Sequence, residues 1–210
     1  NAKSLSSIGY GIAFNKNYSV NPASLSENNK TYFECSNNKW IFDIKGSYLS
    51  YSDKNIRLSG YYWKVDDIEM YDNTPSESPL STFGSKTLVL NFSQGFNLSS
   101  HQLGYNLKYT YMKLLEYEDK GFVLDLGYQY QFNRQSSIGL LVKNLNTGFK
   151  DDNHLSEIFI VGTSQKIKNI PITLNLDLFR NSSEDISGLY QGLVFENKYF
   201  NLTAGYVYNY

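Results

Sequence analysis

The chain lacks the residue types on which several common folds and activities depend. Its one cysteine, Cys35, cannot form an internal disulfide, and no cysteine or histidine spacing indicates a zinc or redox site. It has 4 prolines and 2 histidines, and no apolar run approaches the roughly 18 residues of a membrane helix. The formal net charge of -1 gives no electrostatic case for nucleic-acid binding, and we expect none.

Aromatic residues are abundant instead. There are 19 tyrosines and 13 phenylalanines, which favour strands because aromatic rings pack well on a pleated surface. The last stretch, 200–210, has an apolar or aromatic residue at every second position, and only a strand converts that period into one apolar and one polar face. These positions are Phe200, Leu202, Ala204, Tyr206, Tyr208 and Tyr210.

The same alternation recurs along most of the chain, and no segment has a convincing helical period. A spacing of roughly 13–16 residues per strand and turn predicts about eleven strands from residue 30 onward. Most joints between them are short and polar, but longer polar connections are predicted at 66–86 and 146–157. The predicted strands lie near 30–37, 40–49, 56–63, 88–93, 103–112, 122–132, 136–145, 157–167, 172–178, 189–196 and 200–210.

The apolar faces are long enough to cross a lipid bilayer. They run for about ten residues, which matches a tilted membrane strand and exceeds the usual soluble strand of about 5–6 residues. They carry no Lys, Arg, Asp or Glu, whereas the opposite faces do. The sequence therefore predicts an all-β fold, a single antiparallel up-and-down transmembrane β-barrel of about 10–14 strands. A soluble β-sandwich is the alternative, because its core face also alternates.

This reading assigns a face to individual side chains. Residues 30–210 would form the barrel, and residues 1–29, which differ in character, would be a plug-like segment packed in or against it. The polar side chains predicted to face the lumen are Asp43, Lys45, Arg57, Lys108, Asp125 and Asp177. The tyrosines predicted to face lipid or form an aromatic girdle are Tyr105, Tyr109, Tyr128, Tyr130, Tyr206, Tyr208 and Tyr210.

The N-terminal segment carries a family resemblance. The small-residue stretch 2–14, followed by Asn21-Pro22-Ala23 and Leu25, resembles the start of the PorV/PorQ group of FadL-like outer-membrane β-barrels. The resemblance covers 2–25 and 119–206. Members of that group typically have more strands and continue past the segment matching 204–206, so this chain is expected to be either a compact member or a fragment. Its last residues also resemble the C-terminal signal of barrel assembly.

The resemblance implies a function. It predicts an integral protein of the bacterial outer membrane, associated with a type IX protein secretion or surface-attachment complex. Its expected partners are membrane lipid or lipopolysaccharide and other outer-membrane or secretion-complex proteins. One alternative is a FadL-like channel for hydrophobic small molecules, in which Asn21, Pro22 and Ala23 belong to a hatch inside the lumen. Another is a purely structural barrel subunit of a larger envelope complex.

No catalytic constellation is recognisable, so we expect neither an enzyme nor a bound cofactor or metal. His101 and His154 fall in predicted loops, with no nucleophile or ligand at motif spacing. The run 151–153 (Asp-Asp-Asn) lacks the later ligands of an EF-hand. The glycines of 9–11 lack the context of a phosphate loop and instead favour close packing of this segment against a barrel wall.

Overall fold

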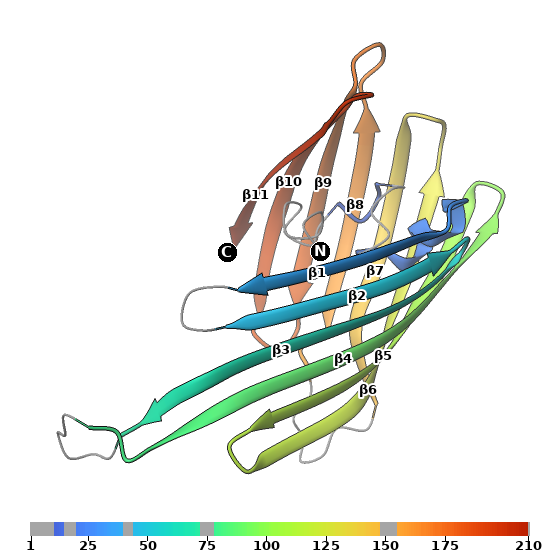
Figure 1. The fold of residues 1–210 in the computed structure, drawn as a ribbon. Helices are drawn as coiled ribbons and strands as arrows, with labels where there is room; N and C mark the ends of the chain where they lie inside the picture. The colour runs from blue at the N-terminus through green and yellow to red at the C-terminus, as the bar shows by residue number, and fades with distance from the viewer. Residues whose placement is uncertain (1–10, 15–19, 40–43, 72–77, 148–154, 210) are drawn as a thin grey trace.

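The protein is an all-β sheet structure. The computed structural model describes residues 11–14, 20–39, 44–71, 78–147 and 155–209. They form one sheet of 11 antiparallel strands in which every strand pairs with its neighbours in sequence, as Figure 1 shows. This confirms the up-and-down all-β architecture predicted from the alternation. No helix in the described ranges is both long and apolar enough to span a membrane.

The strands follow the chain in simple order, after a short 3-10 helix η1 (Pro22–Glu27). Their bounds are β1 (Tyr32–Lys39), β2 (Lys45–Asp53), β3 (Ile56–Met70), β4 (Ser81–Leu98), β5 (His101–Leu114), β6 (Tyr117–Gln131), β7 (Ser136–Thr147), β8 (Ile158–Lys166), β9 (Ile172–Asn181), β10 (Ile186–Glu196) and β11 (Asn201–Asn209).

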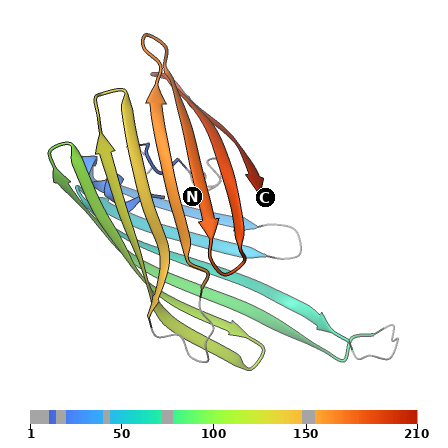
Figure 2. The same ribbon diagram turned by 180° about the vertical axis from the view of Figure 1, so that it is seen from behind.

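The sheet curls around the N-terminal segment, as the two opposite views in Figures 1 and 2 show. Its edges are β1 and β11, and within the described residues no backbone pairing joins them. Because the strands alternate in direction and number 11, β1 and β11 run the same way. Closure of the sheet into a barrel is therefore not part of the described structure.

The connections differ between the two ends of the strands. At one end the joints are short: 54–55, 99–100, 132–135, 167–171 and 197–200. At the other end lie the longest connections, which join β3 to β4 and β7 to β8. We call these the short-turn end and the long-loop end.

The predicted connection 66–86 is wrong in its bounds. β3 continues to Met70 and β4 begins at Ser81, with Met70 paired to Ser81 across a register shift between Val65 and Ile68. The two strands continue past their apolar stretch as a polar ribbon, which sequence alternation alone read as a loop. The predicted connection 146–157 is also shorter, since β7 runs to Thr147 and β8 starts at Ile158; residues 148–154 lie outside the described residues.

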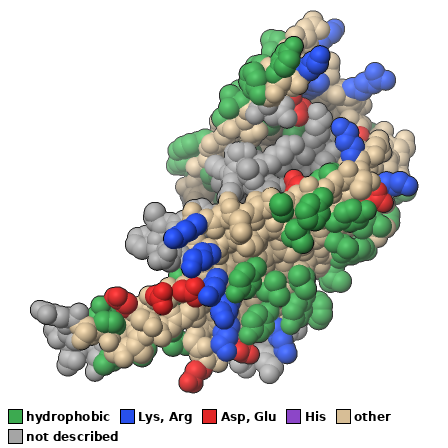
Figure 3. All heavy atoms as spheres, viewed as in Figure 1, with side chains coloured by type: hydrophobic (Ala, Val, Ile, Leu, Met, Phe, Trp, Pro, Cys, Tyr) green, Lys and Arg blue, Asp and Glu red, His purple; other side chains and the backbone are tan. Residues whose placement is uncertain are grey.

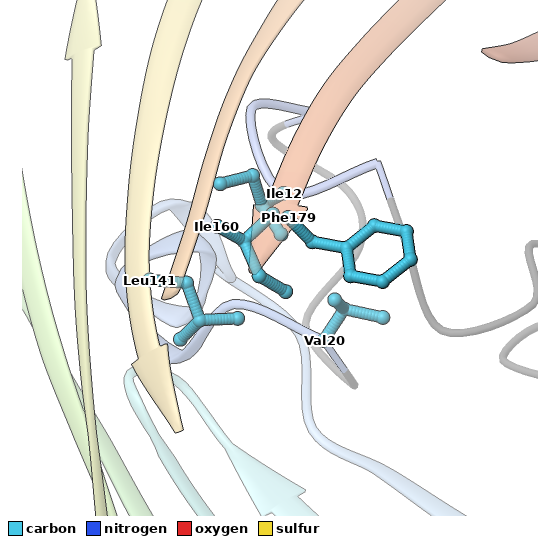
Figure 4. Close-up of a cluster of buried hydrophobic side chains, with 5 residues drawn as sticks. All are labelled: Ile12, Val20, Leu141, Ile160 and Phe179. Carbon is cyan, nitrogen blue, oxygen red and sulfur yellow. The ribbon is translucent and has the colours of Figure 1, made fainter. Parts of the chain in front are cut away.

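The apolar core sits between the N-terminal segment and one face of the sheet. Figure 4 shows Ile12 and Val20 of that segment against Leu141 of β7, Ile160 of β8 and Phe179 of β9. We call the face that contacts residues 11–14 and 20–28 the inner face, and the opposite one the outer face.

Candidate functional site

The two faces of the sheet show the reverse of the usual burial pattern. On β6, Asp125 is 1% exposed whereas the next residue, Leu126, is 45% exposed. On β9, Asp177 is 0% exposed and Leu178 is 53% exposed. Figure 3 shows hydrophobic side chains spread over the visible surface. Polar side chains are therefore covered and apolar ones uncovered, which a protein surrounded by water avoids.

Most of the charged residues predicted to face a lumen share the inner face. Arg57 is buried, with Nη2 2.9 Å from Oε2 of Glu34 on β1, and it also donates to the Tyr48 hydroxyl. Lys108 on β5 places Nζ 2.6 Å from Oδ2 of Asp125. Asp177 lies deepest, against the N-terminal segment.

Asp125 is held by residues of the two strands that flank it, β5 and β7. Asn106 Nδ2 donates to its Oδ2 at 3.0 Å, and the backbone N–H of Asn144 donates to its Oδ1 at 3.0 Å. Asn144 has a positive φ of 62°, at the point where the register of β6 and β7 shifts opposite Asp125. The carboxylate thus satisfies the backbone N–H that this bulge leaves without a strand partner.

Lys45 is a correction. It lies on the outer face, opposite Lys64 in the β2–β3 pairing, and its side chain is 54% exposed. The alternation that begins at Trp40 predicts Lys45 on the polar, inner face, but β2 begins at Lys45 and its inner positions are 46, 48, 50 and 52. Tyr48 turns inward because its hydroxyl accepts from Arg57 and its ring meets Tyr61 at 4.6 Å. Asp43 lies outside the described residues.

The predicted girdle tyrosines occupy outer-face positions. Tyr206 and Tyr208 are 66% and 55% exposed on β11, and Tyr210 lies outside the described residues. The others are half-buried among outer-face neighbours: Tyr105, Tyr109, Tyr128 and Tyr130.

The histidine predicted in a loop is part of this outer surface. His101 begins β5, and its Nδ1 lies 2.8 Å from the Tyr128 hydroxyl. Its ring centroid is 4.8 Å from that of Tyr130. The prediction of a loop at His101 is wrong because the turn between β4 and β5 comprises only residues 99–100, so His101 already belongs to β5. His154, the run 151–153 and residues 9–10 lie outside the described residues.

The motif Asn21-Pro22-Ala23 fixes the N-terminal segment to the inner face. Asn21 caps η1, its Oδ1 accepting from the Ala23 N–H at 3.0 Å, and Pro22 occupies the first turn, where a missing N–H costs nothing. The Asn21 amide donates to the carbonyl of Ile12 at 2.9 Å and to that of Tyr128 at 3.3 Å. The Asn21 side chain therefore ties η1 both to the turn formed by residues 11–14 and to β6.

Inner-face polar groups complete the attachment of residues 11–13. Asp177 Oδ2 accepts from the N–H groups of Gly11 at 2.5 Å and Ile12 at 3.1 Å. Gln129 donates to the Ile12 carbonyl at 2.5 Å, and Ser137 donates to the Ala13 carbonyl at 2.7 Å. These side chains supply hydrogen bonds that the buried backbone of residues 11–13 requires.

A glycine track lets this segment lie directly on the sheet. Gly95 pairs with Gly104, which pairs with Gly127, and Gly139 pairs with Gly162, so glycines cross five adjacent strands. A methyl group on Gly104 would overlap backbone atoms of Pro22 and Ala23, and the other four would also meet residues of the segment. The absence of side chains here is required for close approach.

Sequence reasoning missed this track. The alternation predicted the charged residues of the polar face but gave no role to the glycines among them. The sequence does contain a signal: Gly127 stands at an alternate position between Asp125 and Gln129, so it belongs to the same face as these polar residues and not to that of Leu126 and Tyr128. The pairing that lines the glycines up depends on register, which a single sequence does not contain.

In the described part of the chain, no cluster of three or more His, Cys, Asp or Glu side chains is placed to hold a metal ion. The hydrogen bonds of Asp177, Asn21, Gln129 and Ser137 to residues 11–13 make the site an arrangement that holds a peptide segment against a sheet. No protein-family model and no curated protein matches this chain.

Proposed function

We propose that this sheet belongs to an integral outer-membrane β-barrel whose outer face contacts lipid and whose inner face holds residues 11–14 and 20–28 as an internal plug. The observation that carries the proposal is that polar side chains are buried on the inner face while apolar side chains are exposed on the outer face. On β9, for example, Asp177 is buried and Leu178 is exposed. A charge on a lipid-facing barrel position costs about 2–4 kcal/mol near the bilayer midplane, whereas an inner position tolerates it.

The dimensions support the same proposal. The outer positions of β4 from Leu88 to Leu98 are apolar except Gln94. At about 3.4 Å per residue and a tilt of about 45°, this stretch rises roughly 25 Å, which is the height of the apolar band of known membrane barrels. The long-loop end would then face the cell surface and the short-turn end the periplasm, following the usual asymmetry of such barrels.

Closure is part of the proposal. In hydrocarbon, each unpaired backbone N–H or C=O at the β1 and β11 edges would cost several kcal/mol, so both edges must be paired there. β1 and β11 run the same way, so direct contact would pair them in parallel. Antiparallel pairing throughout would require an odd number of further strands between them.

The native Cys35 offers a test of direct closure. Cys35 is exposed on the outer face of β1, and the chain contains no second cysteine that would interfere with the test. Single cysteines would be introduced along outer positions of β11, at Leu202, Ala204, Tyr206 and Tyr208, in the membrane-inserted protein. Direct closure predicts a disulfide with Cys35 from at least one position, since paired strands lie about 5 Å apart. No crosslink from any position would reject direct closure.

The test of the membrane proposal is heat modifiability. A folded membrane barrel resists detergent and changes its gel mobility on boiling. The expected result is a boiling-dependent shift for protein extracted from membranes. A chain that stays soluble without detergent and shows no shift would contradict the proposal.

Within this class we propose a role in a type IX protein secretion or surface-attachment complex, on the strength of the resemblance of 2–25 and 119–206 to the PorV/PorQ group. The experiment that tests this role is mild crosslinking in intact cells, followed by purification. Recovery with a large secretion-channel or surface-attachment subunit supports this role. Recovery only as a lone chain would contradict it.

One observation favours the alternative, a FadL-like channel. Residues 11–14 and 20–28 occupy the inner side as a hatch would, and Ile12 and Val20 form an apolar contact with Phe179 there. The other covered inner-face positions are mainly polar, which suits water or polar solutes better than hydrophobic ones. The test is uptake of a labelled fatty acid by liposomes that contain the protein. Uptake that increases in the Asp177→Ala variant, whose plug is loosened, would identify the channel. Equal uptake with and without the protein would reject it.

A further inference from the structure

Lysines stand opposite one another on adjacent strands of the outer face. Lys45 pairs with Lys64, Lys64 with Lys86, and Lys86 with Lys113, across β2 to β5. We call Lys45, Lys64, Lys86 and Lys113 the lysine row; Lys39 continues it on β1. Figure 3 shows blue side chains gathered beside the hydrophobic surface of these strands. Like charges directly opposite one another destabilise a sheet, so this row is costly unless an anion offsets it.

The chain itself offsets part of that charge. Asp66 Oδ2 lies 2.8 Å from Lys64 Nζ and 3.7 Å from Lys45 Nζ. Glu118 Oε1 lies 2.6 Å from Lys113 Nζ. Asp66 and Glu118 pair with three of the row's four lysines, and Asp67 also acts electrostatically on Lys64. Four positive charges therefore stand against three negative ones, and Lys86 forms no ion pair with any of the described residues, so the row keeps a positive balance.

The row sits at one limit of the apolar outer surface. The next outer positions toward the short-turn end are Ser47, Tyr62, Leu88 and Tyr111, paired in the same order. Beyond them the surface is apolar, beginning with Leu49 and Leu90. Tyrosines beside lysines at the border of an apolar band are typical of the headgroup level of a bilayer.

The outer surface is hollowed directly beside the row. Two adjoining hollows of about 460 and 510 Å³ share Leu49 and Gly60 in their walls. Gly60 occupies an outer-face position between Leu49 of β2 and Leu90 of β4. A Cβ added at Gly60 would meet only Leu90 Cδ2, at an ordinary contact distance of 3.6 Å. Unlike the inner-face glycines, Gly60 is not needed for close backbone packing. Its effect is to leave an apolar hollow.

We propose that the lysine row and the Gly60 hollow together bind an acyl lipid with an anionic phosphate headgroup. The phosphate would lie along the ammonium groups, and an acyl chain would lie in the hollow over β2 to β4. The inference rests on the proposed membrane insertion. A lipid suits both parts of the site, whereas free inorganic phosphate would use only the lysines.

The test is native mass spectrometry of the intact protein in a non-ionic detergent. The probes are phosphatidylglycerol and phosphatidylcholine with identical acyl chains, together with inorganic phosphate in a separate arm. The expected result is preferential retention of phosphatidylglycerol. A triple variant, Lys45→Gln, Lys64→Gln and Lys86→Gln, should lower its retention about tenfold, because each interfacial lysine contributes appreciably to anionic-lipid binding.

The control variant makes the same charge change at the other end. It combines three substitutions of exposed lysines in the short turns: Lys54→Gln, Lys168→Gln and Lys198→Gln. This variant should leave lipid retention unchanged. Asp66→Asn removes the carboxylate that pairs with Lys45 and Lys64, so it should raise phosphatidylglycerol retention. Gly60→Leu should fill the hollow and lower retention of both lipids, with little change in headgroup preference.

Equal retention of the two lipids, unaltered in the row variants, would overturn the inference. So would displacement of phosphatidylglycerol by inorganic phosphate at equal concentration, which would indicate a phosphate site without a lipid. The heat shift on gels is measured on the same samples. A normal shift with no lipid preference refutes the lipid site alone, whereas loss of the shift in the unaltered protein refutes membrane insertion itself.

Discussion

The inner and outer faces of the same strands use glycine for opposite purposes. Gly104 on the inner face lies under Pro22 and Ala23, where a methyl group would overlap backbone. Gly60 on the outer face meets only the end of Leu90, at 3.6 Å from an added Cβ. The inner face is thus fitted to a particular peptide segment, whereas Gly60 leaves open space on the outer face, which under the proposed membrane insertion an adaptable neighbour would fill. Lipid is such a neighbour.

The largest expected effect comes from a charge placed on the outer face. Leu126→Arg puts a guanidinium at an exposed apolar position of β6 that the proposal assigns to the membrane interior. It should lower the free energy of unfolding by about 2–4 kcal/mol in lipid vesicles.

Urea titration of protein folded into vesicles measures this effect. Leu98→Arg, at the short-turn limit of the apolar band on β4, is the matched control and should cost about 0–1 kcal/mol. Equal costs at the two positions would contradict a depth-dependent, lipid-facing surface.

The second effect separates the two kinds of glycine. Gly104→Ala should destabilise the protein by about 1–3 kcal/mol, because the segment must move away from the sheet to accept the methyl group. Gly60→Ala should be neutral or stabilising by up to about 1 kcal/mol, since glycine is itself unfavourable in a strand. The same urea titration compares them, and equal destabilisation would erase the distinction between the faces.

The third effect concerns the attachment of the plug. Asp177→Ala removes the carboxylate oxygen that accepts from the N–H groups of Gly11 and Ile12, at a cost of about 1–3 kcal/mol. Hydrogen exchange of the peptide containing residues 11–14 should become at least about fivefold faster. Asn175→Ala, on the same face of β9, is the control, because its Oδ1 has no hydrogen-bond partner in the described structure. Unchanged exchange in Asp177→Ala would show that the segment is held by other contacts.

The sequence predicted the number and order of the strands, but not all of their bounds or which residues they bring together. Alternation in 122–132 predicted both the position of β6 and the face of Asp125, because a period of two is a local property. It failed in β2, where Tyr48 faces inward, because a tyrosine satisfies either face and the true choice depends on its hydrogen bond with Arg57. The glycine track and the lysine row depend on pairing between strands, so neither is visible until register is known.

The N-terminal motif shows the same limit. Asn21-Pro22-Ala23 was recognisable as a distinct segment, and capping by Asn before Pro is a local effect that sequence can suggest. Its contact with the Tyr128 carbonyl, and the acceptance of two N–H groups by Asp177, join residues more than a hundred positions apart. Such contacts follow from the curl of the whole sheet.

The most direct test of the central claim compares two neighbouring residues on β9. With Cys35 replaced by serine, single cysteines at Leu176 and Asn175 would each carry a fluorescent label in vesicles containing brominated lipids. Leu176 is exposed on the outer face and Asn175 is buried on the inner face. The account predicts strong quenching of the label at Leu176 and little at Asn175. Equal quenching at both, or quenching of neither, would contradict a sheet whose outer face lies in lipid.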